Sequence, residues 1–391
     1  MEPVALERLI DLDSVLTEDE ILTRNAVRQF VAEKYLPIIG DHFEHHTFPE
    51  QVIPELGALG LLGASIRGYG CAGVNAVTYG LVLQELEYGD SGLRSFVSVQ
   101  GSLAMYAIYR FGSEAQKQYW LPRMAKGEVI GCFGLTEPDF GSDPGGMRTM
   151  ARRDGDSYVL NGAKMWITNS PVSHLAVVWA KLEEDDPRAV RGFLVERGTP
   201  GFDTPTILKK MSLRASHTGE IILSDCRIPT ANLLPESRGL GSPLACLNQA
   251  RFGIAWGAMG AAKACFDSAL EYSRKRIQFG VPIGSKQLIQ EQLVDMALEI
   301  SKAQLMNYHF ARLKDQDRLT PHQVSMAKKN SVGQALKIAR MARAIHGASG
   351  ISLEFPPIRH MLNLESVYTY EGTDEIHSLI IGRALTGLDA F

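Results

Sequence analysis

Hydrophobic and polar positions follow three different patterns along the chain. Between residues 18 and 125, apolar side chains recur at helical intervals, which predicts amphipathic helices. From about 129 to 235, short runs that suit strands, such as SYVLNGAKMWITN and GEIILSDCRIP, lie between Gly, Pro and Asp turns. After about residue 240, long segments rich in Ala and Leu contain few helix breakers and predict a bundle of helices.

This order of helices, strands and helices predicts an α+β protein without internal repeats or low-complexity linkers. Thr17, followed three residues later by Glu20, predicts a capping box at the start of a helix. We expect an N-terminal helical domain at residues 1–128, a central antiparallel β domain at 129–237 and a C-terminal four-helix bundle domain at 238–391.

A G-x-G-x-x-G pattern between Gly68 and Gly73 has the order of a dinucleotide-binding turn. Such a turn must follow a strand and open a helix. The run before it, residues 50–63, instead has helical spacing, and the runs 74–89 and 91–112 after it also predict helices. We therefore expect a glycine-rich connection between helices that needs unusual backbone angles, and not a dinucleotide-binding turn.

Composition narrows the class of protein. The chain of 391 residues is 45% hydrophobic and 21% charged, as in globular proteins with a large core. A net charge of -4 and the absence of a long apolar run favour neither nucleic acid nor a membrane as a partner. Five cysteines without a C-x-x-C pair favour a reducing compartment. The acidic N-terminus predicts a cytoplasmic location, or the mitochondrial matrix if a targeting peptide has been removed.

Glu371 is a candidate general base. It lies beside Gly372, just before a helix that we expect to begin near Thr373 or Asp374. A loop carboxylate that is partly desolvated has its pKa raised toward the working range of a base. By itself, however, an acid at such a position is more commonly solvated.

Two stretches near the predicted strands suit a heteroaromatic ligand. CFGLTEPDFGSDPGG combines Thr136, Gly141 and Ser142 in a turn-rich loop whose N–H and hydroxyl groups can bind anions. In KMWITNSP, the period of two places Trp166 and Thr168 on one face of a strand. An ordinary turn and a buried core aromatic explain these two stretches equally well.

Two further stretches carry cations. RKRIQFGVPIGSKQLIQ joins Arg276, Phe279 and Gln287, which suit phosphate and adenine contacts, although a basic helix end is the commoner explanation. ELEYGDSGLRS places Arg94 beside Ser95, a combination that can clamp a substrate carboxylate. The histidine-rich DHFEHH run lacks a spaced fourth ligand, so we expect no metal site.

Together, these motifs resemble the flavin-dependent acyl-CoA dehydrogenase family over essentially the whole chain. The motifs are GLTEPDFGSD, KMWITNSP, KKMSLRAS, LNQARFGIAWG, RIQFGVPIGSKQLIQ and TYEGTDEIH, and DSGLRSFVSVQ is most similar to the glutaryl-CoA dehydrogenase subgroup. The resemblance implies an acyl-CoA substrate, a homotetramer, and FAD between the β domain and the C-terminal helices. It also implies that electron transfer flavoprotein accepts the electrons.

The resemblance assigns roles to individual residues. Glu371 matches the base that removes the α-proton of the thioester. Arg94 and Ser95 match residues that hold the distal carboxylate of glutaryl-CoA, and Glu87 and Tyr370 match residues that line that end of the pocket. Oxidation followed by loss of that carboxylate as carbon dioxide would give crotonyl-CoA.

Other matches concern the thioester and the cofactor. Substrate contacts are implied for Ser142, Asn248, Arg251 and Gly372. FAD contacts are implied for Phe133, Leu135, Thr136, Gly141, Ser142, Trp166, Ile167, Thr168, Arg276, Phe279, Gln287, Ala344, Gly347, Ala348, Thr373 and Glu375.

Two other functions remain open. The first is an acyl-CoA dehydrogenase for another dicarboxylyl or aryl thioester, with or without decarboxylation. The second is a flavin-binding scaffold without activity, against which Glu371 argues. The HGASG stretch departs from the family, because Ala348 and Ser349 stand where a second Gly and an Asn are common. We expect His346, in the same stretch, to be packed and not catalytic.

Overall fold

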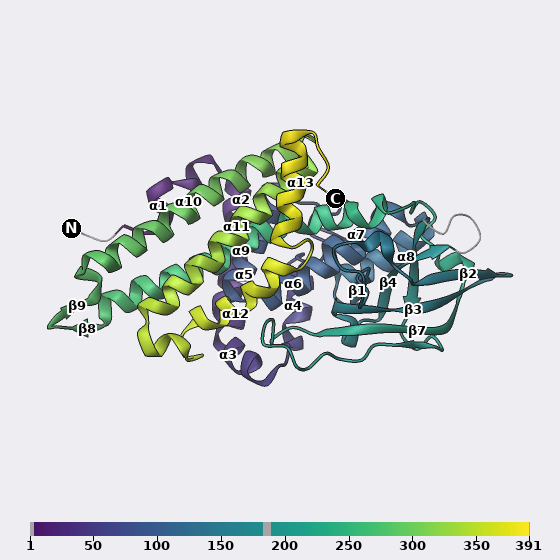
Figure 1. Cartoon of the computed structure of the whole chain (residues 1–391), viewed down its shortest axis with the longest axis horizontal. Coiled ribbons are helices and arrows are strands. Elements are labelled where there is room, and N and C mark those ends of the chain that lie inside the picture. Colours follow the sequence, from purple (N-terminus) through teal and green to yellow (C-terminus); the bar gives the residue numbers. More distant parts are fainter. Residues whose placement is uncertain (1–3, 183–188, 391) are drawn as a thin grey trace.

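The computed structural model describes residues 4–182 and 189–390. Helices make up one end of the molecule and a β-sheet the other, so the predicted α+β class is confirmed (Figure 1). The capping box is also present, since Thr17 and Glu20 exchange side-chain to backbone hydrogen bonds. The N-terminal helices are α1 (Leu6–Ile10), α2 (Glu18–Phe30), α3 (Leu36–His45), α4 (Ile53–Ala58), α5 (Ala76–Gly89), α6 (Ser91–Ser98), α7 (Tyr106–Phe111) and α8 (Glu114–Ala125).

The glycine pattern lies in the connection between α4 and α5, as predicted. Gly68, Gly70 and Gly73 have φ angles of 82°, 77° and 66°. A Cβ atom at Gly68 or Gly70 would meet no other atom within 4 Å. Their backbone angles, and not a close contact, therefore favour glycine at these two positions.

The helix predicted over 91–112 is not regular. Between α6 and α7 the chain forms a π-helical segment, Val99–Met105. There the buried Gln100 accepts a hydrogen bond from Gly131 N (2.7 Å) and donates to Val129 O (2.8 Å). The irregular turn therefore lies where the helix joins the sheet, a contact that the hydrophobic period could not indicate.

The central sheet differs from the prediction in its strand directions. β4 pairs with β5 in the antiparallel sense but with both β1 and β2 in parallel, so the sheet is mixed and not wholly antiparallel. Alternation of side chains identifies a strand without giving the direction of its neighbour, which explains the error. The strands are β1 (Gly131–Gly134), β2 (Met150–Asp154), β3 (Ser157–Thr168), β4 (Leu175–Leu182), β5 (Val190–Glu196), β6 (Phe202–Asp203) and β7 (Thr218–Pro229).

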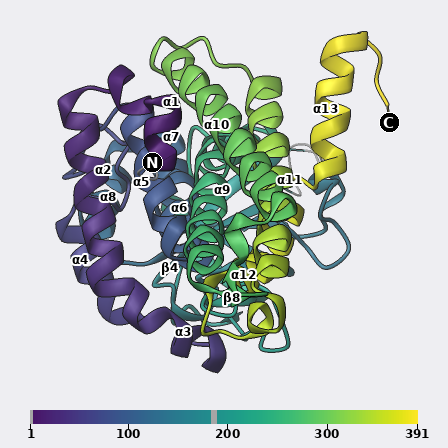
Figure 2. The same ribbon diagram turned by 90° about the vertical axis from the view of Figure 1, so that its left-hand side faces the viewer.

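Five helices follow the sheet, and the last of them lies beside the bundle, packed on α11 (Figure 2). None of the described helices is both long enough and apolar enough to cross a membrane. The elements are α9 (Gly241–Lys275), the short hairpin β8 (Ile277–Gln278) and β9 (Val281–Pro282), α10 (Gln287–Asp315), α11 (Pro321–Ile345), α12 (Pro356–Thr369) and α13 (Asp374–Thr386).

Helix α9 packs unusually close to α5. Three glycines on α9, Gly253, Gly257 and Gly260, face α5, and a Cβ atom at any of them would overlap an α5 residue. At Gly260 the overlapping atom is the backbone oxygen of Gln84, which cannot rotate away. Glycine therefore sets the distance between the N-terminal helices and the C-terminal bundle.

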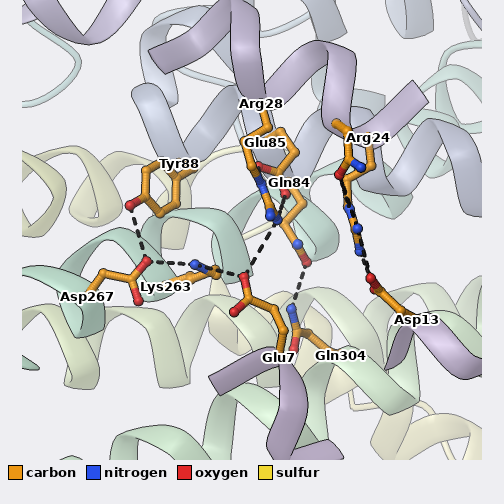
Figure 3. A network of polar contacts seen from close by, with 11 residues as sticks. Glu7, Asp13, Arg24, Arg28, Gln84, Glu85, Tyr88, Lys263, Asp267 and Gln304 are labelled. Atoms are coloured by element: carbon orange, nitrogen blue, oxygen red, sulfur yellow. Dashed lines mark hydrogen bonds and ion pairs between the residues drawn. The ribbon is translucent and has the colours of Figure 1, made fainter. Parts of the chain in front are cut away.

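Ion pairs connect α1 to α9 and α2, and α2 in turn to α5 (Figure 3). Glu7 on α1 lies 3.2 Å from Lys263 on α9 and 3.7 Å from Arg28 on α2. Arg28 also pairs with Glu85 on α5 at 2.9 Å. These partly buried charges join segments that are far apart in the sequence.

Replacing Gly260 by Ala should lower the free energy of unfolding by about 2–3 kcal/mol, because the added methyl group overlaps the α5 backbone. Gly333→Ala is the matched control: it lies within α11 and its added Cβ would meet no atom within 4 Å. That variant should be neutral, or more stable by up to about 1 kcal/mol. Urea denaturation at fixed protein concentration measures both, and equal destabilisation would contradict close packing as the cause.

Candidate active site

The loop that carries Glu371 has an unusual backbone. It connects α12 to α13, and Glu371 and Gly372 have φ angles of 52° and 93°. Helix α13 begins at Asp374, with the Thr373 side chain accepting a hydrogen bond from the backbone of its first turn, as predicted. A Cβ atom at Gly372 would lie 2.9 Å from His377 Nε2, so both conformation and space require glycine there.

The Glu371 carboxylate is shielded from solvent. Its Oε2 atom is buried and has no hydrogen-bond partner among the described residues. Burial raises the pKa of Glu371, while the positive charges of Arg94, Arg251 and Lys328 act against that rise. The alternative of a solvated loop acid is therefore wrong, and the carboxylate has the environment of a general base.

A buried polar group lies next to this loop. Arg94 on α6 is 1% exposed, and its Nε donates to Glu87 Oε2 at 2.7 Å. Its Nη2 donates to the Tyr370 hydroxyl, which lies 3.4 Å from Ser95 Oγ. Burial tends to lower the pKa of Arg94, but Glu87 reverses that effect and holds the pKa above its usual value. The structure thus brings together Glu87, Arg94, Ser95 and Tyr370 beside Glu371.

Two further cations hold the backbone of the loop. Arg251 on α9 donates from Nε to the Glu371 carbonyl (2.7 Å) and from Nη1 to Asn248 Oδ1 (3.3 Å). Lys328 on α11 donates from Nζ to the carbonyls of Tyr370 (2.8 Å) and Gly372 (2.6 Å). The resemblance implied substrate contacts for Arg251 and Asn248, and the structure places Arg251 against the backbone of Glu371.

Sequence reasoning missed Lys328. Its position gives a signal, because Lys328 lies four residues after Val324 and four before Val332, both on the buried face of α11. A lysine within such a stripe must either reach solvent or find buried acceptors. Lys328 is 1% exposed, so it takes the second course.

The loop after β1 lies against the end of β3. The Thr136 carbonyl accepts a hydrogen bond from Met165 N (2.9 Å), and buried Lys164 donates to the Leu135 carbonyl (3.2 Å). Gly141 and Ser142 are exposed. Leu135 is buried, and the Phe133 ring packs in the core with its centroid 5.8 Å from that of Trp179. The loop and the strand therefore lie together, whereas the Phe133 side chain is buried in the core beside Trp179.

Trp166 is 56% exposed, so it is not a buried core aromatic. The register of β3 against β7 shifts between Lys164 and Ile167, and Trp166 has a φ of 63° within this bulge. The bulge interrupts the alternation that we used to place Trp166 and Thr168 on one face. Ile167 is buried and Thr168 half-buried, while the indole ring is presented to solvent beside the polar loop.

Other residues for which FAD contacts are implied lie outside the sheet and its loops. Arg276, Phe279 and Gln287 are exposed at the β8–β9 hairpin and the start of α10, at the opposite end of the molecule from the sheet (Figure 1). Phe279 is 93% exposed. The other residues of this implied set are exposed Ala344 in the last turn of α11, exposed Gly347 and Ala348 just after it, half-buried Thr373, and exposed Glu375 on α13.

The histidines that drew attention in the sequence have structural partners. His42 Nδ1 lies 2.8 Å from Thr47 Oγ1, and His45 Nδ1 lies 2.8 Å from the Asp41 carbonyl. Among the described residues, no cluster of three or more side chains could hold a metal ion. His346 is packed, as expected, with its ring centroid 4.5 Å from that of Tyr272.

Comparison with known families agrees with this geometry. Residues 17–128, 132–226 and 237–386 match the N-terminal, middle and C-terminal domains of acyl-CoA dehydrogenase. The chain belongs to the acyl-CoA dehydrogenase family. It is therefore a flavin-dependent oxidoreductase, and its cofactor is FAD.

Individual acyl-CoA dehydrogenases are similar over at least 94% of the chain. A glutaryl-CoA dehydrogenase from Mycobacterium smegmatis in complex with FADH2 is 52% identical, covers 100% of both chains and has a TM-score of 0.97. A glutaryl-coenzyme A dehydrogenase in complex with glutaryl-CoA is 34% identical, covering 95% of this chain and 96% of the other, with a TM-score of 0.91. A short-chain specific acyl-CoA dehydrogenase of Rattus norvegicus is 37% identical over 94% of this chain and 90% of its own.

The site residues fit FAD at the β-sheet end. A bulge that exposes an indole ring, together with a polar loop in which Gly141 and Ser142 are exposed, suits a flat heteroaromatic ring with polar edges. Trp166, Thr168, Thr136 and Ser142 would make these contacts.

Trp166→Ala should weaken FAD binding about fivefold, because stacking on an aromatic side chain contributes about 1 kcal/mol. Since the indole is exposed, the thermal unfolding of the FAD-free protein should not change. Tyr119→Ala, which removes another aromatic residue that is 56% exposed, is the control and should retain full affinity. Titration of the FAD-free protein with FAD gives the affinities, and unchanged affinity in the Trp166 variant would exclude stacking there.

Proposed function

We propose that this acyl-CoA dehydrogenase oxidises glutaryl-CoA and decarboxylates the product to crotonyl-CoA. The buried Arg94 carries this proposal. Its Nε and Nη2 are occupied by Glu87 and Tyr370, and Nη1 has no hydrogen-bond partner among the described residues. A guanidinium group beside the base suits an acyl chain that ends in a carboxylate, whereas a chain ending in a methyl group would leave it unmatched.

The first step is proton removal by Glu371. An α-proton of a thioester is weakly acidic, so its loss requires a positioned carboxylate and donors aimed at the carbonyl oxygen. The unpartnered Oε2 of Glu371 takes that proton. The β-carbon loses a hydride in the same oxidation, and FAD supplies the acceptor for it. The product is the 2,3-enoyl thioester.

The second step removes the distal carboxyl group. The enoyl product of glutaryl-CoA can lose this group as carbon dioxide, and the electron pair of the broken bond passes into a dienolate. Reprotonation of the dienolate gives crotonyl-CoA. Arg94 and Ser95 hold the carboxylate until it leaves, and Glu87 and Tyr370 fix the guanidinium through the contacts described above.

We also infer that the FAD site needs more than one copy of the chain. The hairpin β8–β9, which carries Phe279, projects from the end of the bundle that points away from the sheet, whereas Trp166 lies on β3 within the sheet (Figure 1). Exposed Phe279, on a hairpin that projects from the bundle, suits insertion into a neighbouring copy. A homotetramer with electron transfer flavoprotein as acceptor is the assembly that the family resemblance supports.

A second candidate is the oxidation of a short-chain acyl-CoA without decarboxylation. The 37% identity to short-chain specific acyl-CoA dehydrogenases favours it. The higher identity of 52% to a glutaryl-CoA dehydrogenase favours the first candidate, as does the buried Arg94.

Mass spectrometry of the products tests the proposal. Protein mixed with glutaryl-CoA and an artificial electron acceptor should form crotonyl-CoA and carbon dioxide. Arg94→Gln should reduce kcat/KM for glutaryl-CoA about 100-fold, because a charge-assisted contact of roughly 3 kcal/mol is lost, whereas butyryl-CoA oxidation should fall far less. Oxidation of glutaryl-CoA without crotonyl-CoA would overturn decarboxylation, and equal losses on both substrates would overturn the clamp.

Arg94→Gln also leaves Glu87 as an unpaired buried charge, which could disturb the fold. The double variant Glu87→Gln/Arg94→Gln removes both charges and serves as the control. If the double variant recovers glutaryl-CoA turnover, the orphaned carboxylate caused the loss. If turnover stays low while butyryl-CoA is still oxidised, the missing guanidinium caused it.

Glu371→Gln should lower kcat by about 10²–10⁴-fold while FAD stays bound, because general base catalysis contributes that much. In the unmodified enzyme, kcat should fall at acid pH as Glu371 becomes protonated. Burial raises the pKa of Glu371, so the midpoint of that fall should lie above 4.5. Steady-state rates between about pH 4 and pH 9 measure both effects, and a kcat that stays constant down to pH 4 would remove Glu371 as the base.

A further inference from the structure

Lys328 is a buried cation without a carboxylate partner among the described ion pairs. Its ammonium group donates only to two backbone carbonyls, those of Tyr370 and Gly372, which flank the base. The ring centroid of Tyr370 lies 6.0 Å from Nζ. Because an unpaired buried charge costs stability, a lysine here needs a compensating role.

Lys328 and Arg251 bind the backbone of the turn that carries Glu371. Lys328 holds the carbonyls before and after Glu371, and Arg251 holds the carbonyl of Glu371 itself at 2.7 Å. Three successive carbonyl groups are thus bound by buried cations. None of these bonds uses the Glu371 carboxylate, whose Oε2 stays without a partner. The loop is therefore held by its backbone while the reactive group remains available.

These bonds also stabilise a strained conformation. Glu371 has a φ of 52°, in the left-handed region, which costs a non-glycine residue about 1 kcal/mol or more. A turn of this kind persists when surrounding contacts determine it. The Lys328 ammonium group, placed between two carbonyls two residues apart, is such a contact.

The surroundings of Lys328 couple it to the base. Burial lowers the pKa of Lys328 to about 7, and the Glu371 carboxylate acts against that lowering. Lys328 is therefore charged in the acid range in which Glu371 would begin to bind a proton. The titratable and charged groups that face it are Glu371, Arg251, Asp374, Arg94 and His377.

We propose that Lys328 is a positioning residue that fixes the Tyr370–Gly372 turn and holds a positive charge beside the Glu371 carboxylate. This inference rests on the proposed role of Glu371 as base. Lys328, on α11, thus acts on the reaction by holding the backbone of the loop and by placing its positive charge near Glu371, without touching the substrate.

Lys328→Met tests the charge and the backbone contacts together. The variant should bind FAD normally, and kcat should fall about tenfold or more with little change in KM, because the base is displaced. The acid limb of the kcat profile should also move about one pH unit upward, since the charge that keeps Glu371 ionised is gone. Lys337→Met makes the same substitution at an exposed site on α11 and should change neither quantity.

Lys328→Arg separates the two effects. It keeps the positive charge, so the acid limb should stay close to that of the unmodified enzyme. Its planar guanidinium cannot place one nitrogen between both carbonyls, so kcat should still fall. An acid limb that shifts equally in both Lys328 variants would overturn the electrostatic part, and unchanged kcat in both would overturn the positioning part.

Infrared titration tests the inference without turnover. The protonated-carboxyl band that disappears in Glu371→Gln identifies Glu371, and its midpoint should lie about one pH unit higher in Lys328→Met than in the unmodified protein. An identical midpoint in the two proteins overturns the coupling, even if the enzyme oxidises acyl-CoA substrates as proposed. A shifted midpoint in a protein that oxidises no acyl-CoA supports the coupling and overturns the proposed function instead.

Discussion

The close approach of α9 to α5 is the constraint on which the site depends. Gly253, Gly257 and Gly260 leave no room for a side chain between the two helices. This contact brings Arg251, on α9, to the carbonyl of the base. The same glycines make space for the other side of the pocket, because a Cβ at Gly257 would overlap the Glu87 carboxylate that holds Arg94. The packing of α9 on α5 thus helps to position Arg94 on α6 and the loop that carries Glu371.

The second constraint is electrostatic. A carboxylate that acts as a general base must be shielded from water, so that its pKa rises toward the working pH, yet it must remain ionised before it reacts. Burial raises the pKa of Glu371, and the three cations Arg94, Arg251 and Lys328 oppose that rise. Each comes from a different helix, α6, α9 or α11, and each is fixed by its own acceptors. The Glu371 carboxylate is therefore surrounded by positive charge without a direct ion pair that would occupy its oxygen atoms.

Several features of the fold and site could be predicted from the sequence. The helical and strand patterns gave the order of the elements, and the lack of a strand before Gly68 excluded a cofactor turn there. The short motif around Glu371 indicated a loop acid just before a helix, and the structure has that arrangement. These features are local: each depends on residues within one or two turns of one another, so periodicity and helix signals are sufficient to find them.

The α+β order of the chain follows from its sequence pattern, and its motifs carry the likeness to flavin-dependent acyl-CoA dehydrogenases. The parallel pairing of β4, the bulge that exposes Trp166, and the burial of Arg94 and Lys328 emerge only when the chain is folded. The bonds of Arg94 to Tyr370 and of Arg251 to Glu371 join segments 276 and 120 residues apart. Whether a charged side chain is solvated or buried depends on such distant neighbours, and no local pattern records them.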